Sequence, residues 1–288
     1  MPLEEYAGQV FQSLGILDDG ARFFRRQDGE NDEEIDRIGV LPAAGGGVIQ
    51  AFGVECKHAR GRWIFPPASP YAWQTSRVAT FQSHPRHPFD GLGPVEASRF
   101  YGKGVALYLS QPGASASKEK WEVDTNKIPN AIRQAALGTM DYFATRLANF
   151  IVSGPSNIQM AFHPIVLTTA DLYVLPPGTT HHAIEGATED LNDVAQKVPS
   201  VELAFRSQPY MQAALWHSFN RELAEQSQAF NWRPKGSIPD AARTLFREHC
   251  AGQPSRCSVV HDTDFKQFLQ AKIAEGAALF APTHVQGD

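Results

Sequence analysis

The sequence predicts an α/β domain in which a central sheet of mixed strand direction is flanked by helices. Three features support this fold class: apolar residues at helical spacing over 3–14 and 130–152, a β-hairpin pattern over 34–57, and a dense apolar run over 165–169. The chain of 288 residues is 42% hydrophobic and 20% charged, which is an ordinary globular balance with enough material for a large core.

The N-terminal part of the chain leads into the hairpin. Residues 3–14 form the expected first helix, which Gly15 ends, and residues 22–26 are expected to form a short strand. The polar segment 27–33 predicts a turn. The hairpin itself consists of two strands between residues 34 and 57, which a Pro/Gly-rich turn joins.

The middle of the chain contains a long segment without a clear period. Residues 60–100 are rich in proline, histidine and aromatic residues, and a stretch of this length inside a compact domain indicates a functional loop or an insertion. Residues 103–110 predict a buried strand, and residues 111–120 predict a surface loop. The long helix over 130–152 follows, and a Gly-Pro pair ends it.

The C-terminal part returns the chain to the sheet. A short strand that ends at Pro176 follows the strand over 165–169, and residues 178–200 predict a loop with a short helix. The remaining expected elements are helices over 209–228 and 239–249, a strand over 256–260, and an amphipathic helix that begins at 261–264 with Thr263 or Asp264 as its N-cap. We therefore expect one domain over 1–288, with a core of about 3–175 and residues 201–280 packed on it.

Charge and composition restrict the function classes. The net charge is −5 and the pI is about 6.1, which argues against a general nucleic-acid coat protein but not against an enzyme with a local cationic site. The N-terminal residues lack the charged and apolar regions of a signal peptide, and no apolar run approaches the roughly 20 residues that cross a bilayer. With three cysteines, these features predict a cytoplasmic protein without a membrane partner, and they leave the oligomeric state open.

The hairpin carries three charged residues where apolar residues are expected. Side chains alternate along a strand, so Glu55 and Lys57 project from one face while Val54 and Cys56 project from the other. Asp36, on the preceding strand, lies beside them when the hairpin closes. Burial of such charges is costly unless they have a partner or a purpose.

These charged residues predict a metal site. Two carboxylates on adjacent strands can hold a hard divalent cation such as Mg²⁺ or Mn²⁺, here Asp36 and Glu55, with the Cys56 carbonyl as a further ligand. The ion lowers the pKa of a bound water and neutralises charge on a phosphate under attack. Lys57 would position that water or stabilise the phosphate. The sequence therefore predicts Asp36, Glu55 and Lys57 as catalytic residues.

The pattern Glu34-Ile-Asp36…Glu55-Cys-Lys57, on a hairpin after an N-terminal helix, resembles the PD-(D/E)xK nuclease superfamily, which includes Mrr-type restriction endonuclease-like enzymes. Members share a core of helix, three strands, helix and strand, which is the order predicted here from residue 3 to about 170. The resemblance implies a restriction endonuclease-like three-layer fold and Mg²⁺-dependent hydrolysis of DNA phosphodiester bonds, with RNA left open as a substrate.

The resemblance also implies accessory residues. Some members use a glutamate of the first helix, for which Glu4 or Glu5 is the local candidate, and a glutamine near the site, for which Gln134 is the candidate; Glu34 is a further acidic candidate. The sequence departs from the family pattern at Ile35, where a proline is usual, and in the absence of the tyrosine that accompanies the glutamine.

Basic residues follow the hairpin directly. His58, Arg60 and Arg62 precede Trp63 and Phe65, and a combination of cations with aromatic rings is typical of nucleic-acid contacts. Solvated charges after a strand are the alternative interpretation. We therefore expect His58, Arg60 and Arg62 to contact DNA.

Other interpretations of the charged residues remain open at this point. Asp36, Glu55 and Lys57 could form a structural salt bridge at a sheet edge, or belong to a catalytically inactive nucleic-acid or protein-interaction module on the same fold. An unrelated zinc hydrolase is a further alternative. Its candidate ligands are His84, His87, His181 and His182.

Overall fold

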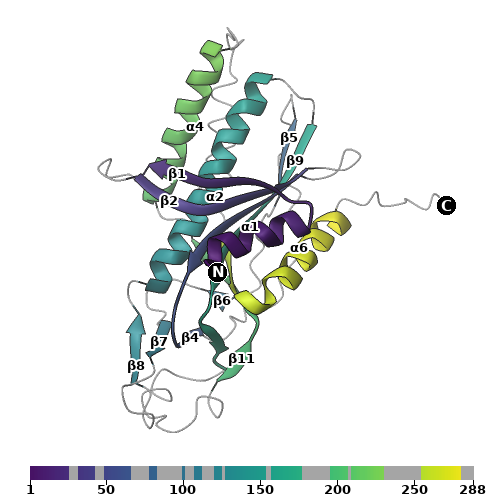
Figure 1. Cartoon of the computed structure of the whole chain (residues 1–288). Coiled ribbons are helices and arrows are strands. Elements are labelled where there is room, and N and C mark those ends of the chain that lie inside the picture. The colour runs from purple at the N-terminus through teal and green to yellow at the C-terminus, as the bar shows by residue number, and fades with distance from the viewer. Residues whose placement is uncertain are drawn as a thin grey trace, which may run out of the picture.

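The computed structural model describes residues 1–25, 32–42, 49–65, 78–82, 99–100, 107–111, 120–124, 127–153, 157–176, 195–206, 209–229 and 254–279. These residues form two sheets and the helices that pack on them (Figure 1). The elements up to the long helix are α1 (Leu3–Ser13), β1 (Leu17–Arg25), β2 (Asp32–Leu41), β3 (Ile49–Lys57), β4 (Arg62–Phe65), β5 (Val78–Gln82), β6 (Arg99–Phe100), β7 (Leu107–Gln111) and β8 (Lys120–Asp124). The later elements are α2 (Lys127–Ser153), β9 (Asn157–Thr168), β10 (Asp171–Val174), β11 (Gln196–Val198), β12 (Ser200–Arg206), α4 (Pro209–Ala229), β13 (Pro254–His261), the 3₁₀ turn η2 (Asp262–Asp264) and α6 (Phe265–Leu279).

The larger sheet is mixed, as the sequence predicts. Its strand order is β1-β2-β3-β9-β13-β12-β6, and β5 pairs with the first half of β9. β1, β2 and β3 are antiparallel neighbours, whereas β3, β9 and β13 run parallel. The carboxyl ends of these three parallel strands therefore meet at one edge, where Lys57 is in register with Thr168 and Thr168 with His261.

Helices cover both faces of the larger sheet (Figure 1). α2 packs on one face with buried residues that include Ile132, and α4 packs along α2. α1 and α6 lie side by side on the other face, where the ring of Phe11 is 6.3 Å from that of Phe265 and 6.5 Å from that of Phe52. All three rings are fully buried, and each contributes on the order of 2–3 kcal/mol to folding through the hydrophobic effect.

A close approach fixes β3 against α2. A Cβ atom at Gly53 would collide with the hydroxyl of Thr139, and one at Gly138 would lie 2.6 Å from the Cβ of Ile35. Glycine at these two positions therefore lets the helix lie directly on the hairpin. This contact fixes the position of β3, which carries Glu55, relative to α2.

The second sheet continues from the first. It has the order β11-β10-β4-β7-β8, and β4 and β10 are parallel, as are β3 and β9 that precede them along the chain. The hydroxyl of Thr169 accepts a hydrogen bond from the amide of Ala59 (3.1 Å) and donates one to its carbonyl (2.9 Å), which ties the two linkers together. A parallel pair of strands thus runs through both sheets.

Most of the predicted elements agree with the structure in type, and several differ in extent. The first strand begins at Leu17 and not at residue 22, and residues 32–33 belong to β2 and not to the preceding turn. The segment 60–100 was expected to be a loop, but it contains β4, β5 and β6. Likewise, β11 lies at 196–198, within the segment 178–200 where a loop with a short helix was expected, and β12 begins at the end of that segment. The helix predicted over 239–249 lies outside the described residues.

The strand and helix patterns fail where strands are short or alternate poorly. β11 has three residues with mostly exposed side chains, and its sequence carries no apolar run. Pairing with β10, which lies elsewhere in the sequence, holds it in an extended conformation. Among the helices that the structure describes, none combines the length and the hydrophobicity that a bilayer crossing requires.

Candidate metal centre

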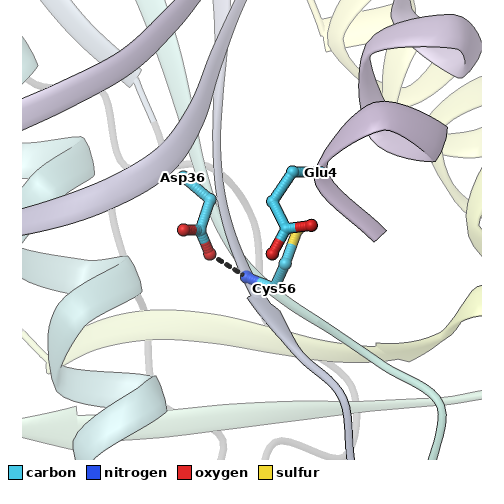
Figure 2. Close-up of side chains that lie close together, drawn as sticks. All are labelled: Glu4, Asp36 and Cys56. Carbon is cyan, nitrogen blue, oxygen red and sulfur yellow. Dashed lines mark hydrogen bonds between the residues drawn. The ribbon is translucent and has the colours of Figure 1, made fainter. Parts of the chain in front are cut away.

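The centre of the site is an irregularity in β2. Gly20 pairs with Ile38 but Arg22 pairs with Ile35, so β2 carries one extra residue over this interval. β2 pairs with β3 from Leu41 to Arg37. Next to its end, the Asp36 carboxylate accepts a hydrogen bond of 2.6 Å from the backbone N–H of Cys56 on β3 (Figure 2). A carboxylate therefore occupies the position that a backbone carbonyl fills in a continuous antiparallel ladder.

Helix α1 adds a second carboxylate to this point. Glu4 lies in the first turn of α1, and Figure 2 shows its carboxylate directed towards Asp36 and Cys56. One oxygen of Glu4, one oxygen of Asp36 and the sulfur of Cys56 all lie within 4.8 Å of one another. The backbone N–H of Leu3 donates to Nε2 of His58 at 3.3 Å, which connects the start of this helix to the residue after β3.

Glu55 and Lys57 project from β3 as the alternation of the strand predicts. Val54 and Cys56 pack in the apolar cluster under α1 and α6, so Glu55 faces the side of α2. Oε1 of Glu55 pairs with the ammonium of Lys57, and its Oε2 is buried without a hydrogen-bond partner in the described structure. The Glu55 side chain is 2% exposed and that of Lys57 is 35% exposed, so the pair connects the interior with the surface.

Burial and mutual repulsion shift the ionisation of these acids. Burial, followed by the nearby charge of Asp36, raises the pKa of Glu55 to about 7 against the opposing effect of Lys57. Burial also raises the pKa of Asp36, although the Cys56 amide and Lys57 oppose this shift. Burial, followed by the charges of Asp36 and Glu4, raises the pKa of the Cys56 thiol. A nearby cation would therefore stabilise the ionised forms of Asp36, Glu55 and Cys56.

An ion pair between α2 and β2 lies on the α2 side of the sheet. Both guanidinium NH₂ groups of Arg133 donate to the carboxylate of Glu33, each at 2.7 Å. Glu33 also raises the pKa of Glu55 through its charge. The bidentate geometry fixes the start of β2 on the long helix.

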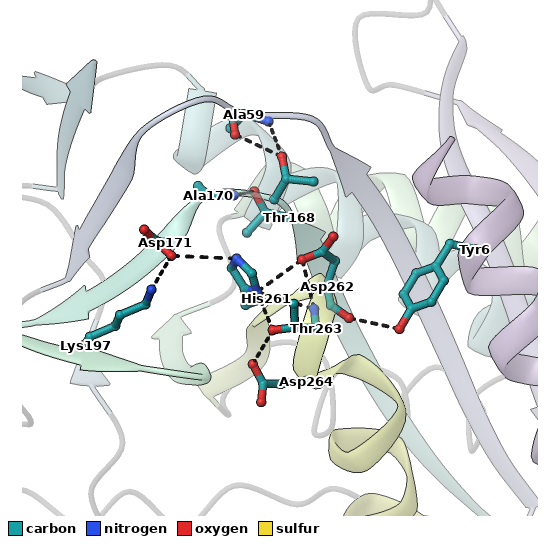
Figure 3. Close-up of polar contacts among 11 residues, drawn as sticks. Tyr6, Ala59, Thr168, Ala170, Asp171, Lys197, His261, Asp262, Thr263 and Asp264 are labelled. Carbon is teal, nitrogen blue, oxygen red and sulfur yellow. Dashed lines mark hydrogen bonds and ion pairs between the residues drawn. The ribbon is translucent and has the colours of Figure 1, made fainter. Parts of the chain in front are cut away.

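The carboxyl edge of the parallel strands carries a second group of polar residues (Figure 3). Nδ1 of His261 is 2.8 Å from the hydroxyl of Thr263, and its Nε2 is 3.8 Å from Asp171. His261 is the N-cap of η2, and its ring accepts from the backbone N–H of Thr263. α6 begins at Phe265, directly after Asp264, so the N-cap expected for this helix at Thr263 or Asp264 stays a prediction. The ring and the Asp262 carboxylate therefore start η2 and, through it, α6.

α1 connects this group to the candidate metal centre. The hydroxyl of Tyr6 donates to the backbone carbonyl of Asp262 at 3.0 Å. On the other side, Asp171 pairs with the exposed Lys197 of β11 at 2.6 Å. Since the contacts of His261 are those of a helix cap and an ion pair, we assign it a structural role.

The structure brings together most of the predicted site residues. Asp36, Glu55, Lys57 and Cys56 are neighbours, but Glu55 is not a member of the close group of ligand atoms, and Cys56 enters that group through its sulfur. Of the two candidate glutamates on the first helix, Glu4 points into the site, whereas Glu5 is exposed. Glu34 is exposed on β2, and Gln134 is half-buried on α2.

The predicted nucleic-acid residues take different positions. Arg60 is exposed, and the guanidinium of Arg62 lies over the ring of Tyr173 at 5.5 Å from its centroid. His58 is exposed, although its ring accepts the amide of Leu3. The histidines of the alternative zinc site, His84, His87, His181 and His182, lie outside the described residues.

Sequence reasoning missed two residues near the site. Arg133 carries the ion pair behind β2, and Lys197 adds a cation beside Arg62. Neither stands in a motif, and each reaches its place only through tertiary packing. Comparison with protein-family models, with curated proteins and with solved structures gives no match to this chain.

Proposed function

We propose that this protein is a metal-dependent nuclease that hydrolyses phosphodiester bonds of DNA. The observation that carries the proposal is the position of Asp36 of β2 between two other acids: its carboxylate lies close to that of Glu4 of α1, and its charge raises the pKa of Glu55 of β3, which pairs with Lys57. Most of these side chains are partly or fully buried. A divalent cation would stabilise the ionised form of these acids more strongly than Lys57 does alone.

The residues fit a divalent ion such as Mg²⁺ or Mn²⁺. Oε2 of Glu55 is a buried oxygen that lacks a donor in the described structure, and burial raises the pKa values of both Asp36 and Glu55, so a bound cation would favour their ionised forms. In the proposal, Asp36 and Glu55 hold the ion, and Glu4 is a third carboxylate ligand. A bound ion of this kind supplies a water of lowered pKa and neutralises charge on a phosphate.

Lys57 has the second role in the proposed reaction. Its ammonium lies beside the Glu55 carboxylate and is partly exposed, so it can contact both the attacking water and the phosphate. A fixed cation at this position stabilises the negative charge that develops on the phosphate oxygens. Burial of Glu55 keeps bulk water away from the carboxylate that orients this lysine.

The arrangement of the larger sheet supports the restriction endonuclease-like part of the proposal. Elements α1, β1, β2, β3, α2 and β9 follow in the order helix, three antiparallel strands, helix, parallel strand, and β4 to β8 are inserted between β3 and α2. The acids lie where β2 and β3 separate, and the lysine ends β3. This is the order and the position that the resemblance to PD-(D/E)xK nucleases implies.

Basic residues on and beside the second sheet are candidates for contacts with DNA phosphates. Arg60 follows Lys57 in the linker, Arg62 starts β4, and Lys197 lies on the neighbouring β11–β10 pair. Contacts of this kind bind phosphates without reading sequence. Substitution of Arg60 or Arg62 by Gln should lower the slope of log K against log salt concentration by about one per lost contact.

A cleavage assay tests the proposal. Purified protein should nick or cut supercoiled plasmid when Mg²⁺ or Mn²⁺ is present and lose this activity in EDTA. Glu55→Gln and Lys57→Ala should each lower the rate by about 100-fold or more, whereas Glu5→Gln and Lys266→Ala, at exposed positions, should not change it. Cleavage that persists in the Glu55 and Lys57 variants would contradict the assignment.

The same assay separates the nuclease from a non-catalytic module on the same fold. A binding module would retain plasmid in a gel-shift experiment without metal, would cut nothing, and would keep its affinity after Glu55→Gln. A nuclease binds and cuts, and it loses only the second property in that variant.

A further inference from the structure

We propose that the thiol of Cys56 is itself a metal ligand, so that the site prefers Mn²⁺, Co²⁺ or Zn²⁺ to Mg²⁺. This inference rests on the metal centre of the proposed function and deepens it by naming the class of ion. The sequence assigned Cys56 a role through its backbone carbonyl. The structure instead directs its sulfur to the carboxylates of Glu4 and Asp36 (Figure 2).

The spacing of the three ligand atoms agrees with one shared ion. Bonds of about 2.3 Å to sulfur and 2.0–2.2 Å to oxygen allow two ligand atoms on one zinc ion to be at most about 4.5 Å apart. The sulfur and the two oxygens all lie within 4.8 Å of one another. Small rotations of the partly exposed Glu4 side chain are therefore enough to bring the ligand set to bonding distance.

The ligand atoms come from parts of the fold that hold them in place. The backbone N–H of Cys56 donates to Asp36, which fixes the carboxylate relative to the same residue that carries the sulfur. Val54 and Cys56 pack under α1, so the sulfur has little freedom to turn away. Glu4 lies on the helix whose first amide is bound to His58. Each of the three ligands is thus positioned by backbone contacts.

The surroundings of Cys56 differ from those of the other described cysteine. Cys257 is completely buried, and its sulfur contacts the carbonyl of the next residue at 3.8 Å, which is the environment of a structural thiol. The sulfur of Cys56, in contrast, lies within 4.8 Å of a carboxylate oxygen of Glu4 and of one of Asp36, and these three are ligand atoms that a divalent ion can bind. Glu55, the preceding residue of β3, faces α2 and does not belong to this group. We therefore place the ion among Glu4, Asp36 and Cys56.

The chemistry of sulfur gives the selectivity. Mg²⁺ binds oxygen ligands in near-octahedral geometry and retains several waters, so a thiolate contributes little to its affinity. Affinity of a mixed oxygen and sulfur site rises from Mn²⁺ through Co²⁺, and Zn²⁺ accepts thiolate readily. An all-oxygen site built from Glu4, Asp36 and Glu55 would lack the additional preference for Mn²⁺, Co²⁺ and Zn²⁺ over Mg²⁺ that a thiolate gives.

Optical spectroscopy with Co²⁺ tests the inference directly. Metal-free protein titrated with CoCl₂ should show a near-ultraviolet band of thiolate-to-cobalt charge transfer that saturates at one equivalent. Cys56→Ser should abolish this band and weaken Co²⁺ binding about tenfold or more. Cys257→Ala is the matched control, because it removes the other described buried thiol, and it should leave the band unchanged.

A second measurement covers the case in which Cys56→Ser folds poorly. Circular dichroism without metal establishes whether the variant is folded, and Cys56→Ala replaces it if it is not. In the wild type, Mn²⁺ and Zn²⁺ should raise the melting temperature more than Mg²⁺ at equal concentration, and the Cys56 variant should lose this difference. A charge-transfer band that is absent in the wild type, or that persists in the Cys56 variant, overturns the inference.

The two proposals fail separately. Cleavage of DNA with no cobalt–thiolate band would retain the nuclease and refute the thiol ligand. A band that depends on Cys56, in a protein that cuts neither DNA nor RNA, would retain the ligand and refute the nuclease.

Discussion

Replacement of Glu55 by glutamine should change the pH dependence of folding in a manner that identifies this carboxylate. The folded protein holds the pKa of Glu55 at about 7, against 4.5 in an unfolded chain. Below pH 4.5 both states are protonated. As pH rises from 4.5 to 7, the unfolded chain releases a proton that the folded protein retains, so the wild type loses stability over this window.

The magnitude follows from the difference between the two pKa values. A difference of about 2.5 pH units corresponds to about 3 kcal/mol of unfolding free energy at most. Glu55→Gln keeps the size of the side chain and cannot ionise. The free energy of unfolding of the variant relative to that of wild type should therefore rise by about 3 kcal/mol between pH 4.5 and pH 8.

Urea denaturation followed by circular dichroism, in buffers with EDTA, measures this quantity. Glu5→Gln, on an exposed carboxylate, is the control, and its stability relative to wild type should stay nearly constant over the same range. Addition of Mn²⁺ should recover the lost stability of the wild type above pH 7 and should do so less for Glu55→Gln. A difference between Glu55→Gln and wild type that does not change with pH would refute the assignment of a buried, destabilised carboxylate.

Three further substitutions test the framework of the site. Gly53→Ala places a methyl group against α2 and should lower the unfolding free energy by about 1–3 kcal/mol, measured as a lower urea midpoint. Arg133→Lys cannot retain both hydrogen bonds to Glu33 and should cost about 1 kcal/mol in the same assay; Arg133→Gln should cost at least as much. His58→Ala removes the acceptor of the Leu3 amide, so hydrogen exchange at that amide should become faster while the core amides are unchanged.

The pattern of charges in the hairpin was sufficient to locate the candidate site. Strand alternation alone predicts that Glu55 and Lys57 share a face, and the structure agrees because Val54 and Cys56 pack on the other side. The position of Asp36 could not be predicted in the same way. The extra residue in β2 shifts its register, and a single inserted residue leaves no mark in the hydrophobic pattern.

The long segment between β3 and α2 shows a different limit. Its short strands β4 and β7 form a sheet with β10 and β11, which come from beyond α2. Periodicity describes a residue's near neighbours in sequence, whereas these strands are stabilised by partners far away. The sequence could not distinguish Glu4 from Glu5 for the same reason, since only the packing of α1 on β3 directs Glu4 to Asp36.

The parallel pair that passes from one sheet to the other has a mechanical consequence. A joint between two units bends easily when a single strand crosses it, but here β3–β4 and β9–β10 cross together, and Thr169 connects the two crossings. Twisting the smaller sheet must therefore rotate both strands at once. Lys57 is the last residue of β3 before this joint, so a rotation of the smaller sheet would act on the backbone next to this lysine.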